Sequence, residues 1–315
     1  MLHGQRITEH ASLGRDTPHP LKRQGPDGSD KEKDVTADSE ITPAQAGQLL
    51  DALTAIVSKA AAATLIIPAA DVARRLKADQ SHVTAADEAS EAVILEGLAW
   101  LLPHIPVVSE EATGHTAPSK LGKNFILVDP LDGTKEFLAG RDEFTINLAI
   151  LTKGIPIAGI VAAPALGLVW RGVVGAGAER LRLKPGSAPA DASERTAIRT
   201  RAWPPQNPLA LVSRSHLNAA TEDFLKRMPG VQCDSRGSSV KFCQVAEGGA
   251  DIYPRLSPQS EWDIAAGHAV LVAAGGVVMS PDGTPLAYGG TPKGFRIPGF
   301  IAWGDPSKAK TIVAG

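Results

Sequence analysis

Hydrophobic residues in the first part of the chain that looks folded recur at helical spacing. Thr42-Pro43 is a typical helix start, an N-cap residue followed by proline at the first helical position. The apolar residues that then share one helical face are Leu49, Leu50, Leu53, Ile56 and Val57. A second helical pattern covers residues 84–102, where Thr84 and Asp87 have the spacing of a capping box. The pattern therefore predicts two helices before the first long strand.

Strand-like apolar runs dominate the middle of the chain, and helical patterns return after it. The predicted strands are residues 125–128, 145–151, 155–161, 168–174, 209–212, 250–253 and 276–279. The later predicted helices are residues 217–228, 239–247 and 262–274. Residues 184–206, rich in Pro, Ala, Ser and Arg, are predicted to be a long connection between two sub-regions, about 42–183 and 207–305. This order of elements predicts an α/β (α+β layered) fold of stacked helices and sheets.

Residues 1–41 differ in composition from the rest of the chain. They are rich in Gly, Pro, Ser and charged residues, and they contain few large apolar side chains. Such a stretch buries too little apolar surface to offset the entropy that is lost when it becomes ordered. We expect a disordered N-terminal tail over residues 1–41 and one folded domain over residues 42–315.

Composition and charge narrow the class of protein. With 32 basic and 34 acidic residues, the net charge of −2 gives no general attraction to nucleic acid or to an anionic membrane. The two cysteines, Cys233 and Cys243, form no CxxC pair, which favours a reduced cytosolic setting over a disulfide scaffold. No signal peptide is visible, and no apolar run approaches the ~20 residues of a membrane span. The chain is expected to be a cytoplasmic globular protein.

The run DPLDGT at residues 129–134 carries the clearest chemical signal. Asp129 and Asp132 follow an apolar strand, so both carboxylates can converge on a hard divalent cation at its carboxyl end. Backbone N–H groups of Gly133 and Thr134 can meet a phosphate oxygen at the same place. A cation beside an anion is the requirement for metal-assisted hydrolysis of a phosphate ester. The alternative is an ordinary turn rich in Asp, Pro and Gly after a buried strand.

Three further acidic residues occupy comparable positions. Glu110 follows a short apolar strand and would supply a third metal ligand and a base for water; a solvated loop is the alternative. Asp263 follows Trp262 at the start of an Ala-rich helix, where it either caps the helix or reaches the metal from the opposite side. Asp87 lies early in a helix, and capping is the alternative there too. His268, inside the Ala-rich helix, is expected to be a packed or hydrogen-bonded side chain rather than a ligand.

Together these motifs resemble the Mg²⁺-dependent, lithium-sensitive phosphomonoesterase superfamily of the inositol monophosphatases. Four parts occur in the order typical of that family: VTAAD at 83–87, SEE at 109–111, DPLDGT at 129–134 and WD at 262–263. Within the superfamily, the bacterial CysQ-type 3′(2′),5′-bisphosphate nucleotidases are most similar. The runs that carry this second resemblance are GTKEF at 133–137, VSRSH at 212–216, GSSVKFC at 237–243 and YPR at 253–255. The resemblance covers about residues 45–305 and implies an αβαβα sandwich.

The resemblance also implies roles for individual residues. The ligands of two Mg²⁺ ions would be Glu110, Asp129, Asp132, Asp263 and the carbonyl of Leu131, and Asp87 would help to hold a third, weaker ion. The catalytic residues would be Asp87, Thr134 and Glu110, with Thr134 positioning the attacking water. The residues that face the substrate would be Gly133, Thr134, His216, Ser238, Lys241, Arg255 and Asp263. Many relatives have proline where this chain has His82, a change that would loosen the loop carrying Asp87.

The implied activity is removal of the 3′-phosphate from adenosine 3′,5′-bisphosphate, giving AMP and phosphate, in sulfate assimilation and nucleotide recycling. Lys241 and Arg255 suit a second phosphate, which an inositol monophosphate lacks. The alternatives are a phosphatase for inositol 1-phosphate or fructose 1,6-bisphosphate, and an RNA- or polymerase-binding protein on the same fold. We expect a monomer or homodimer that binds a small phosphorylated nucleotide, with no nucleic acid and no integral membrane segment. Peripheral association with the inner membrane, to which relatives can be assigned, stays open.

Overall fold

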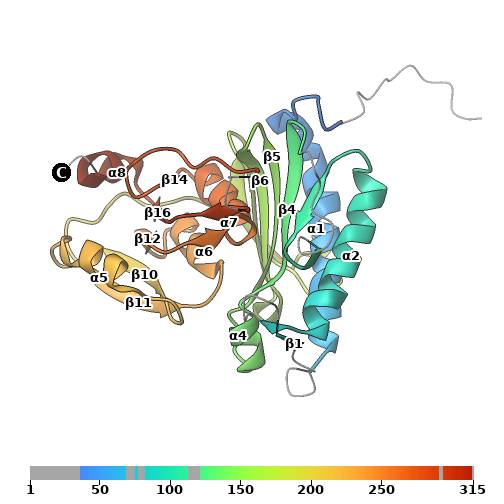
Figure 1. Ribbon diagram of the computed structural model, residues 1–315, viewed down its shortest axis with the longest axis horizontal. Helices are drawn as coiled ribbons and strands as arrows, with labels where there is room; N and C mark the ends of the chain where they lie inside the picture. Colours follow the sequence, from blue (N-terminus) through green and yellow to red (C-terminus); the bar gives the residue numbers. More distant parts are fainter. Residues whose placement is uncertain (1–35, 69–74, 77–81, 113–120, 291–293, 314–315) are drawn as a thin grey trace, which may run out of the picture. The chain divides into compact units, whose positions relative to one another are not determined.

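The computed structural model describes residues 36–68, 75–76, 82–112, 121–290 and 294–313. Its elements stack in five layers, which follow one another from right to left in Figure 1. The layers are a helix pair, a seven-stranded sheet, a second helix pair, a five-stranded sheet and an outer helix pair. The predicted layered α/β fold, an αβαβα sandwich, is therefore confirmed.

The seven-stranded sheet contains its strands in sequence order. They are β3 (Val107–Ser109), β4 (Asn124–Asp132), β5 (Thr145–Thr152), β6 (Ile155–Ala163), β7 (Leu168–Val173), β8 (Gly177–Arg182) and β9 (Glu194–Ile198). Strands β3 and β4 pair in parallel, and every following pair is antiparallel. The side chains of β4 and β5 are buried almost throughout, because helices cover both faces of the sheet.

Helices α1 (Pro43–Ile66) and α2 (Ala85–Leu101) cover one face of this sheet (Figure 1). Both begin where the sequence predicts, since Thr42 and Thr84 each form a capping box with the residue three positions later. Leu53 of α1 and Ile94 and Leu98 of α2 are buried in one cluster with side chains of β4, β5 and β6. Burying each such side chain contributes about 1.5–3 kcal/mol, so packing rather than helix propensity holds this layer in place.

Helices α6 (Val240–Ala246) and α7 (Glu261–Ala273) cover the opposite face of the sheet. Helix α7 approaches β6 closely because Gly159 has no side chain: a Cβ there would lie 2.3 Å from the carbonyl oxygen of Ala266. The first turn of α7 carries Asp263, whose carboxylate lies near that of Asp129 at the far end of β4. The tight helix–sheet contact therefore helps to bring two predicted ligands together.

The five-stranded sheet lies beyond α6 and α7. Its order is β11 (Gln232–Arg236), β10 (Leu209–Ser213), β12 (Ile252–Arg255), β16 (Phe300–Trp303) and β14 (Val277–Met279). On its outer face, Phe224 of α5 (Ala219–Lys226) and Ala309 of α8 (Pro306–Val313) are buried with Trp303. The remaining short elements are β1 (Arg75–Leu76), β2 (His82–Val83), α4 (Thr134–Leu138), η2 (Pro164–Leu166), η3 (Pro189–Asp191), β13 (Gln259–Ser260) and β15 (Arg296–Ile297).

Several stretches differ from the prediction: strands β8 and β16 and helix α8 were not predicted, and two further differences concern residues 184–206 and the N-terminus. Residues 184–206, expected to be only a connection, contain η3 and the edge strand β9, which pairs with β8. Ile198 is the buried residue of β9, so its apolar pattern is too weak to be recognised in the sequence. At the N-terminus, Ile41 is buried and the Asn124 side chain donates to the carbonyl oxygen of Thr36 at 2.7 Å, so the chain joins the domain before Thr42. The rest of the predicted tail, residues 1–35, lies outside the described residues.

Helix α1 is long and apolar enough, by length and composition alone, to cross a membrane. No membrane span was predicted there from the sequence. The core helix of a globular protein passes the same test, and Leu53 and Val57 of α1 are buried against the seven-stranded sheet. The apolar composition of α1 is therefore weak evidence for a membrane span.

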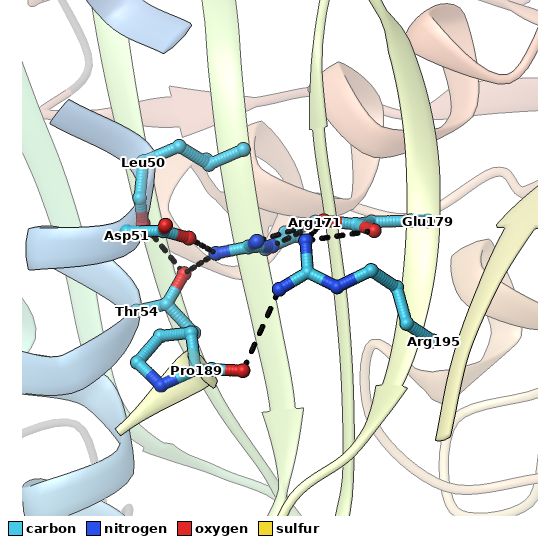
Figure 2. A network of polar contacts seen from close by, with 7 residues as sticks. All are labelled: Leu50, Asp51, Thr54, Arg171, Glu179, Pro189 and Arg195. Carbon is cyan, nitrogen blue, oxygen red and sulfur yellow. Dashed lines mark hydrogen bonds and ion pairs between the residues drawn. The ribbon is translucent and has the colours of Figure 1, made fainter. Parts of the chain in front are cut away.

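Arg171 of β7 connects the sheet to α1 through a buried guanidinium group (Figure 2). Its Nη1 donates to Asp51 Oδ1 at 2.6 Å and to Thr54 Oγ1 at 2.9 Å, both on α1. Its Nε donates to Glu179 Oε1 of β8 at 2.9 Å, and Arg195 of β9 donates to the same oxygen at 3.0 Å. The Arg171 side chain is 2% exposed, whereas that of Asp51 is 72% exposed.

We expect Arg171→Met to lower the free energy of unfolding by about 2 kcal/mol. Removing one partner of a buried ion pair usually costs about 3–5 kcal/mol, but Asp51 can return to water here, which reduces the loss. Urea unfolding measures the change. The matched control is Arg195→Met, which removes a half-exposed arginine from the same network and should cost less than about 1 kcal/mol. Equal stability of the Arg171 variant and the unmodified protein would contradict this account.

Candidate active site

Strand β4 is interrupted at the point where its two acidic residues lie. Asp129 is opposite Asn147 of β5 and Asp132 is opposite Thr145, so Pro130 and Leu131 face a single residue of β5. Proline has no N–H to donate to the ladder, and this bulge re-aims the side chains that follow it. The Pro130 carbonyl accepts a hydrogen bond from Ser90 Oγ of α2 at 2.7 Å. The DPLDGT run is thus a braced bulge at the end of a buried strand.

Three carboxylates from three different elements converge beside this bulge. Glu110, directly after β3, Asp129 on β4 and Asp263 on α7 each place a carboxylate oxygen within 4.8 Å of the other two. Asp132 lies outside that group but lines the same cavity. The arrangement brings together residues that are far apart in the sequence, as the resemblance implied.

The electrostatics of the group favour a bound cation. Burial, followed by the charges of Glu110, Asp132 and Asp263, raises the pKa of Asp129 well above its ordinary value. Burial and the neighbouring carboxylates likewise raise the pKa of Asp263, against the opposing effect of Arg255. Four acidic groups that repel one another in a buried place are stabilised when a positive charge lies between them. Their oxygen-only donor set suits a hard divalent cation.

Asp132 is oriented by hydroxyl groups that the sequence analysis did not connect with it. Ser238 Oγ donates to Asp132 Oδ2 at 2.6 Å, and Ser239 Oγ lies 3.0 Å from the same oxygen. Ser239 Oγ is also 2.8 Å from the backbone carbonyl of Asp263. Both serines belong to the GSSVKFC run, but nothing in that run indicates which carboxylate they contact. These contacts leave Asp132 Oδ1 as the oxygen that can turn towards a cation.

Thr134 and Asp87 lie on the α2 side of the bulge. Thr134 Oγ1 is 3.4 Å from Asp87 Oδ1 and 3.4 Å from the carbonyl oxygen of Leu131. Asp87 is buried, and its Oδ2 accepts from the backbone N–H of Thr84 at 2.9 Å in the capping box. Asp87 therefore caps α2, as one of the two alternatives predicts, and it also contacts Thr134; its role towards a third ion stays a prediction. The side chain of His82 lies outside the described residues.

A cavity of about 660 Å³ opens beside the acidic group. The predicted site residues that line it are Glu110, Asp129, Leu131, Asp132, Gly133, Thr134, His216, Ser238, Lys241, Arg255 and Asp263. Asp87 does not line it and lies behind Thr134. The φ angle of Gly133 is +91°, and a Cβ there would come within 3.3 Å of the Ser238 side chain, so glycine keeps this wall open.

The wall of the cavity formed by the five-stranded sheet is basic. Arg255 on β12 is 8% exposed and donates through Nε to Ser257 Oγ at 3.1 Å. Burial and the charges of Arg255, Lys135 and Lys241 lower the pKa of His216, so its ring is neutral at pH 7. The cavity thus has an acidic group at one wall and fixed positive charge at another, which matches a substrate that carries two phosphates.

Lys241 has a more specific environment than its charge alone suggests. Its Nζ donates to the backbone carbonyls of Ser238 at 2.6 Å and Arg236 at 3.2 Å, and lies 5.0 Å from the centre of the Tyr253 ring. Burial lowers the pKa of Lys241 to about 8, and Arg255 acts in the same direction, although Asp132 partly opposes both. Lys241 therefore braces the turn that carries Ser238 as well as adding charge to the cavity.

Glu143 supports the same turn from outside. Its carboxylate accepts from the backbone N–H of Gly237 at 2.8 Å, from Arg236 at 3.2 Å and from Arg214 at 2.7 Å. Burial would raise the pKa of Glu143, but the hydrogen bonds from Arg214, Gly237 and Arg236 outweigh it and lower the pKa. Glu143 follows α4, so this ion-paired group fastens the segment after the DPLDGT run to the five-stranded sheet.

His268 lies outside the acidic group and is hydrogen-bonded. The Nδ1 of His268 lies 2.9 Å from the hydroxyl oxygen of Tyr288, and burial lowers the pKa of His268 to about 4. The interpretation of His268 as a packed, hydrogen-bonded histidine is therefore confirmed.

Comparison with known proteins gives a consistent result. The profile of the inositol monophosphatase family matches residues 41–297. The 3′(2′),5′-bisphosphate nucleotidase CysQ of Escherichia coli (strain K12) is 43% identical over 225 residues, which cover 71% of this chain and 86% of the relative. The protein of the same name from Buchnera aphidicola is 36% identical, covering 67% and 76%. A crystal structure of CysQ from Bacteroides thetaiotaomicron is 32% identical, with a TM-score of 0.64, covering 80% and 95%.

Proposed function

Because the chain belongs to the inositol monophosphatase family, we propose that it is a 3′(2′),5′-bisphosphate nucleotidase. It would remove the 3′-phosphate of adenosine 3′,5′-bisphosphate and release AMP and phosphate. The observation that carries the proposal is that the acidic group of Glu110, Asp129 and Asp263 lines the same cavity as Arg255 and Lys241. One phosphate would lie against the acidic wall with its cation, and the second would meet the basic wall.

The cation would be Mg²⁺. Glu110, Asp129, Asp132, Asp263 and the carbonyl of Leu131 would hold two ions, with Asp87 contributing to a third through the Thr134 side. Oxygen donors and the raised pKa values of Asp129 and Asp263 support this assignment. When bound, Mg²⁺ would supply the positive charge that polarises a phosphate ester and makes a water molecule more acidic.

The residues of the chain itself would orient the reaction. Thr134, held by Asp87, would fix the water that attacks phosphorus, and Glu110 would accept a proton from it. The backbone N–H groups of Gly133 and Thr134 at the start of α4 would meet an oxygen of the transferred phosphate. Arg255 and Lys241 would hold the 5′-phosphate, so that the 3′-phosphate is presented to the acidic wall.

The test of the proposal is phosphate release from adenosine 3′,5′-bisphosphate and from inositol 1-phosphate, each with Mg²⁺ and with EDTA. We expect turnover only with Mg²⁺ and a much higher kcat/KM for the nucleotide. Preference for inositol 1-phosphate would overturn the role given to the basic wall, but the protein would still be a metal-dependent phosphatase. Absence of turnover with both substrates would overturn the proposed activity.

Lys241 should give the reaction a characteristic pH dependence. Its ammonium group is charged below pH 8 and neutral above it, so KM for the bisphosphate should rise as the pH passes 8. Phosphate monoesters, with a second pKa near 6, keep their charge over the same range, so the substrate does not cause this rise. KM measured from pH 7 to 9.5 should rise for the unmodified protein and stay flat for Lys241→Met. A KM that rises equally in both proteins would assign the titration to another group.

A further inference from the structure

Ser239 is a buried hydroxyl that connects three elements of the fold. It lies just before α6, is 2% exposed, and its Oγ is 3.0 Å from Asp132 Oδ2 of β4. The same Oγ is 2.8 Å from the backbone carbonyl of Asp263 on α7 and 3.0 Å from Asn147 Nδ2 on β5. One side chain therefore contacts two of the predicted ligand residues, Asp132 and Asp263, and neither contact follows from its position in the sequence.

The direction of these hydrogen bonds follows from the inventory of donors. Asp132 Oδ2, while Asp132 is ionised, and the Asp263 carbonyl oxygen can only accept, so the single proton of Ser239 is shared between them in a three-centre hydrogen bond. The lone pairs of Ser239 Oγ then point away from these two acceptors and need a hydrogen-bond donor. Asn147 supplies that donor through Nδ2. The order is thus Asn147 to Ser239 to the ligand-bearing residues.

Asn147 is held in this orientation at a cost. Its side chain is 1% exposed, and its Oδ1 is one of the buried atoms that have no hydrogen-bond partner within the described residues. Rotating the amide would place Oδ1 against Ser239 and would turn the serine proton away from Asp132. A buried amide that leaves one end unpaired in order to donate from the other indicates that the donated bond matters.

We propose that Ser239, oriented by Asn147, is a positioning residue that sets the geometry of the metal ligands Asp132 and Asp263. Ser239 lines the cavity, but its hydroxyl acts through Asp132 and Asp263. By fixing Oδ2 of Asp132, it leaves Oδ1 to face the cation, and by contacting the Asp263 carbonyl it keeps the start of α7 at the correct distance from β4. The inference rests on the proposed metal site.

The proposal is tested by direct metal binding rather than by activity alone. Loss of a hydrogen bond behind a ligand typically weakens metal affinity by 10–100-fold. We expect Ser239→Ala to raise the Kd for Mn²⁺, measured by electron paramagnetic resonance, by that factor, and excess Mg²⁺ to restore turnover. The matched control is Ser58→Ala, which removes an equally buried hydroxyl on α1 that accepts from the Gly186 N–H at 3.0 Å. That control should leave Mn²⁺ affinity unchanged.

Two further variants of the same residue separate hydroxyl chemistry from shape. Ser239→Cys is similar in shape but donates weakly, so it should weaken Mn²⁺ binding as Ser239→Ala does, and it serves as the test if the alanine variant does not fold. Ser239→Thr keeps the hydroxyl and should retain Mn²⁺ affinity. Unchanged Mn²⁺ affinity in the alanine or cysteine variant would overturn the positioning role. An unmodified protein with no nucleotidase activity, combined with weakened Mn²⁺ binding in Ser239→Ala, would overturn the proposed function and keep this inference.

Discussion

Asp129→Asn is expected to lower kcat/KM for the bisphosphate by about a thousandfold. Asp129 lies on β4 and belongs to the acidic group with Glu110 and Asp263. An amide cannot replace the charge of its carboxylate as a ligand of Mg²⁺. A divalent cation contributes several kcal/mol of charge stabilisation, and about 4 kcal/mol corresponds to three powers of ten in rate. Phosphate release at saturating Mg²⁺ measures the change.

The same substitution should stabilise the protein when no metal is present. Burial and the charges of Glu110, Asp132 and Asp263 raise the pKa of Asp129 in the folded state above its value in the unfolded chain. A raised pKa means that the folded state loses stability as the pH rises from the unfolded-chain pKa of Asp129 to its folded pKa, because the unfolded chain ionises more easily. We therefore expect Asp129→Asn to have a higher Tm than the unmodified protein in EDTA, and the gain to be larger at pH 8 than near pH 4.

A surface aspartate provides the control for this pair of effects. Asp191→Asn makes the same atomic change in the exposed helix η3 and should alter neither activity nor Tm. Full activity in Asp129→Asn would contradict the ligand assignment. A lower Tm of that variant in EDTA would show that the Asp129 carboxylate stabilises the metal-free fold rather than destabilising it.

The elements that could be predicted from the sequence are those whose signal is local. Thr84 and Asp87 form their capping box within a few residues of the chain, so the spacing alone places the start of α2. The DPLDGT run has its two acids, its proline and its glycine within six residues, so the change of backbone after the buried strand was predicted there, although the bulge through which β4 continues to Asp132 was not. Local hydrogen bonding and backbone restrictions are properties that a short run of sequence specifies completely.

The parts that were missed depend on contacts between distant segments. Strand β9 becomes a strand only because β8 offers an unpaired edge, which the polar composition of β9 does not reveal. Asn147 and Ser239 are 92 positions apart, and neither has an unusual local setting. Lys241 was correctly expected to lie in the cavity, but its bonds to the carbonyls of Ser238 and Arg236 depend on how the turn before α6 folds back.

Arg255 is expected to determine the preference for a bisphosphate over a monophosphate. Two donors of Lys241 are already bonded to backbone carbonyls. Arg255 is bonded through Nε to Ser257 and also hydrogen-bonds the Tyr253 side chain, which leaves further N–H groups of its guanidinium for the cavity that it lines. A hydrogen bond to a charged group contributes about 1.5–3 kcal/mol, so Arg255→Met should lower kcat/KM for adenosine 3′,5′-bisphosphate by about 10–150-fold, mainly through KM.

Comparison with 3′-AMP, which lacks the 5′-phosphate, isolates this interaction. If Arg255 binds the 5′-phosphate, Arg255→Met should change kcat/KM for 3′-AMP by less than about threefold, because the bond that the substitution removes does not exist in that complex. Removing the 5′-phosphate from the substrate would then lower kcat/KM by nearly the same factor as removing Arg255 from the protein. Making both changes together would lower kcat/KM little more than either change alone. Equal losses for both substrates would instead mean that Arg255 acts on the acidic wall, through its charge next to Asp263, rather than on the second phosphate.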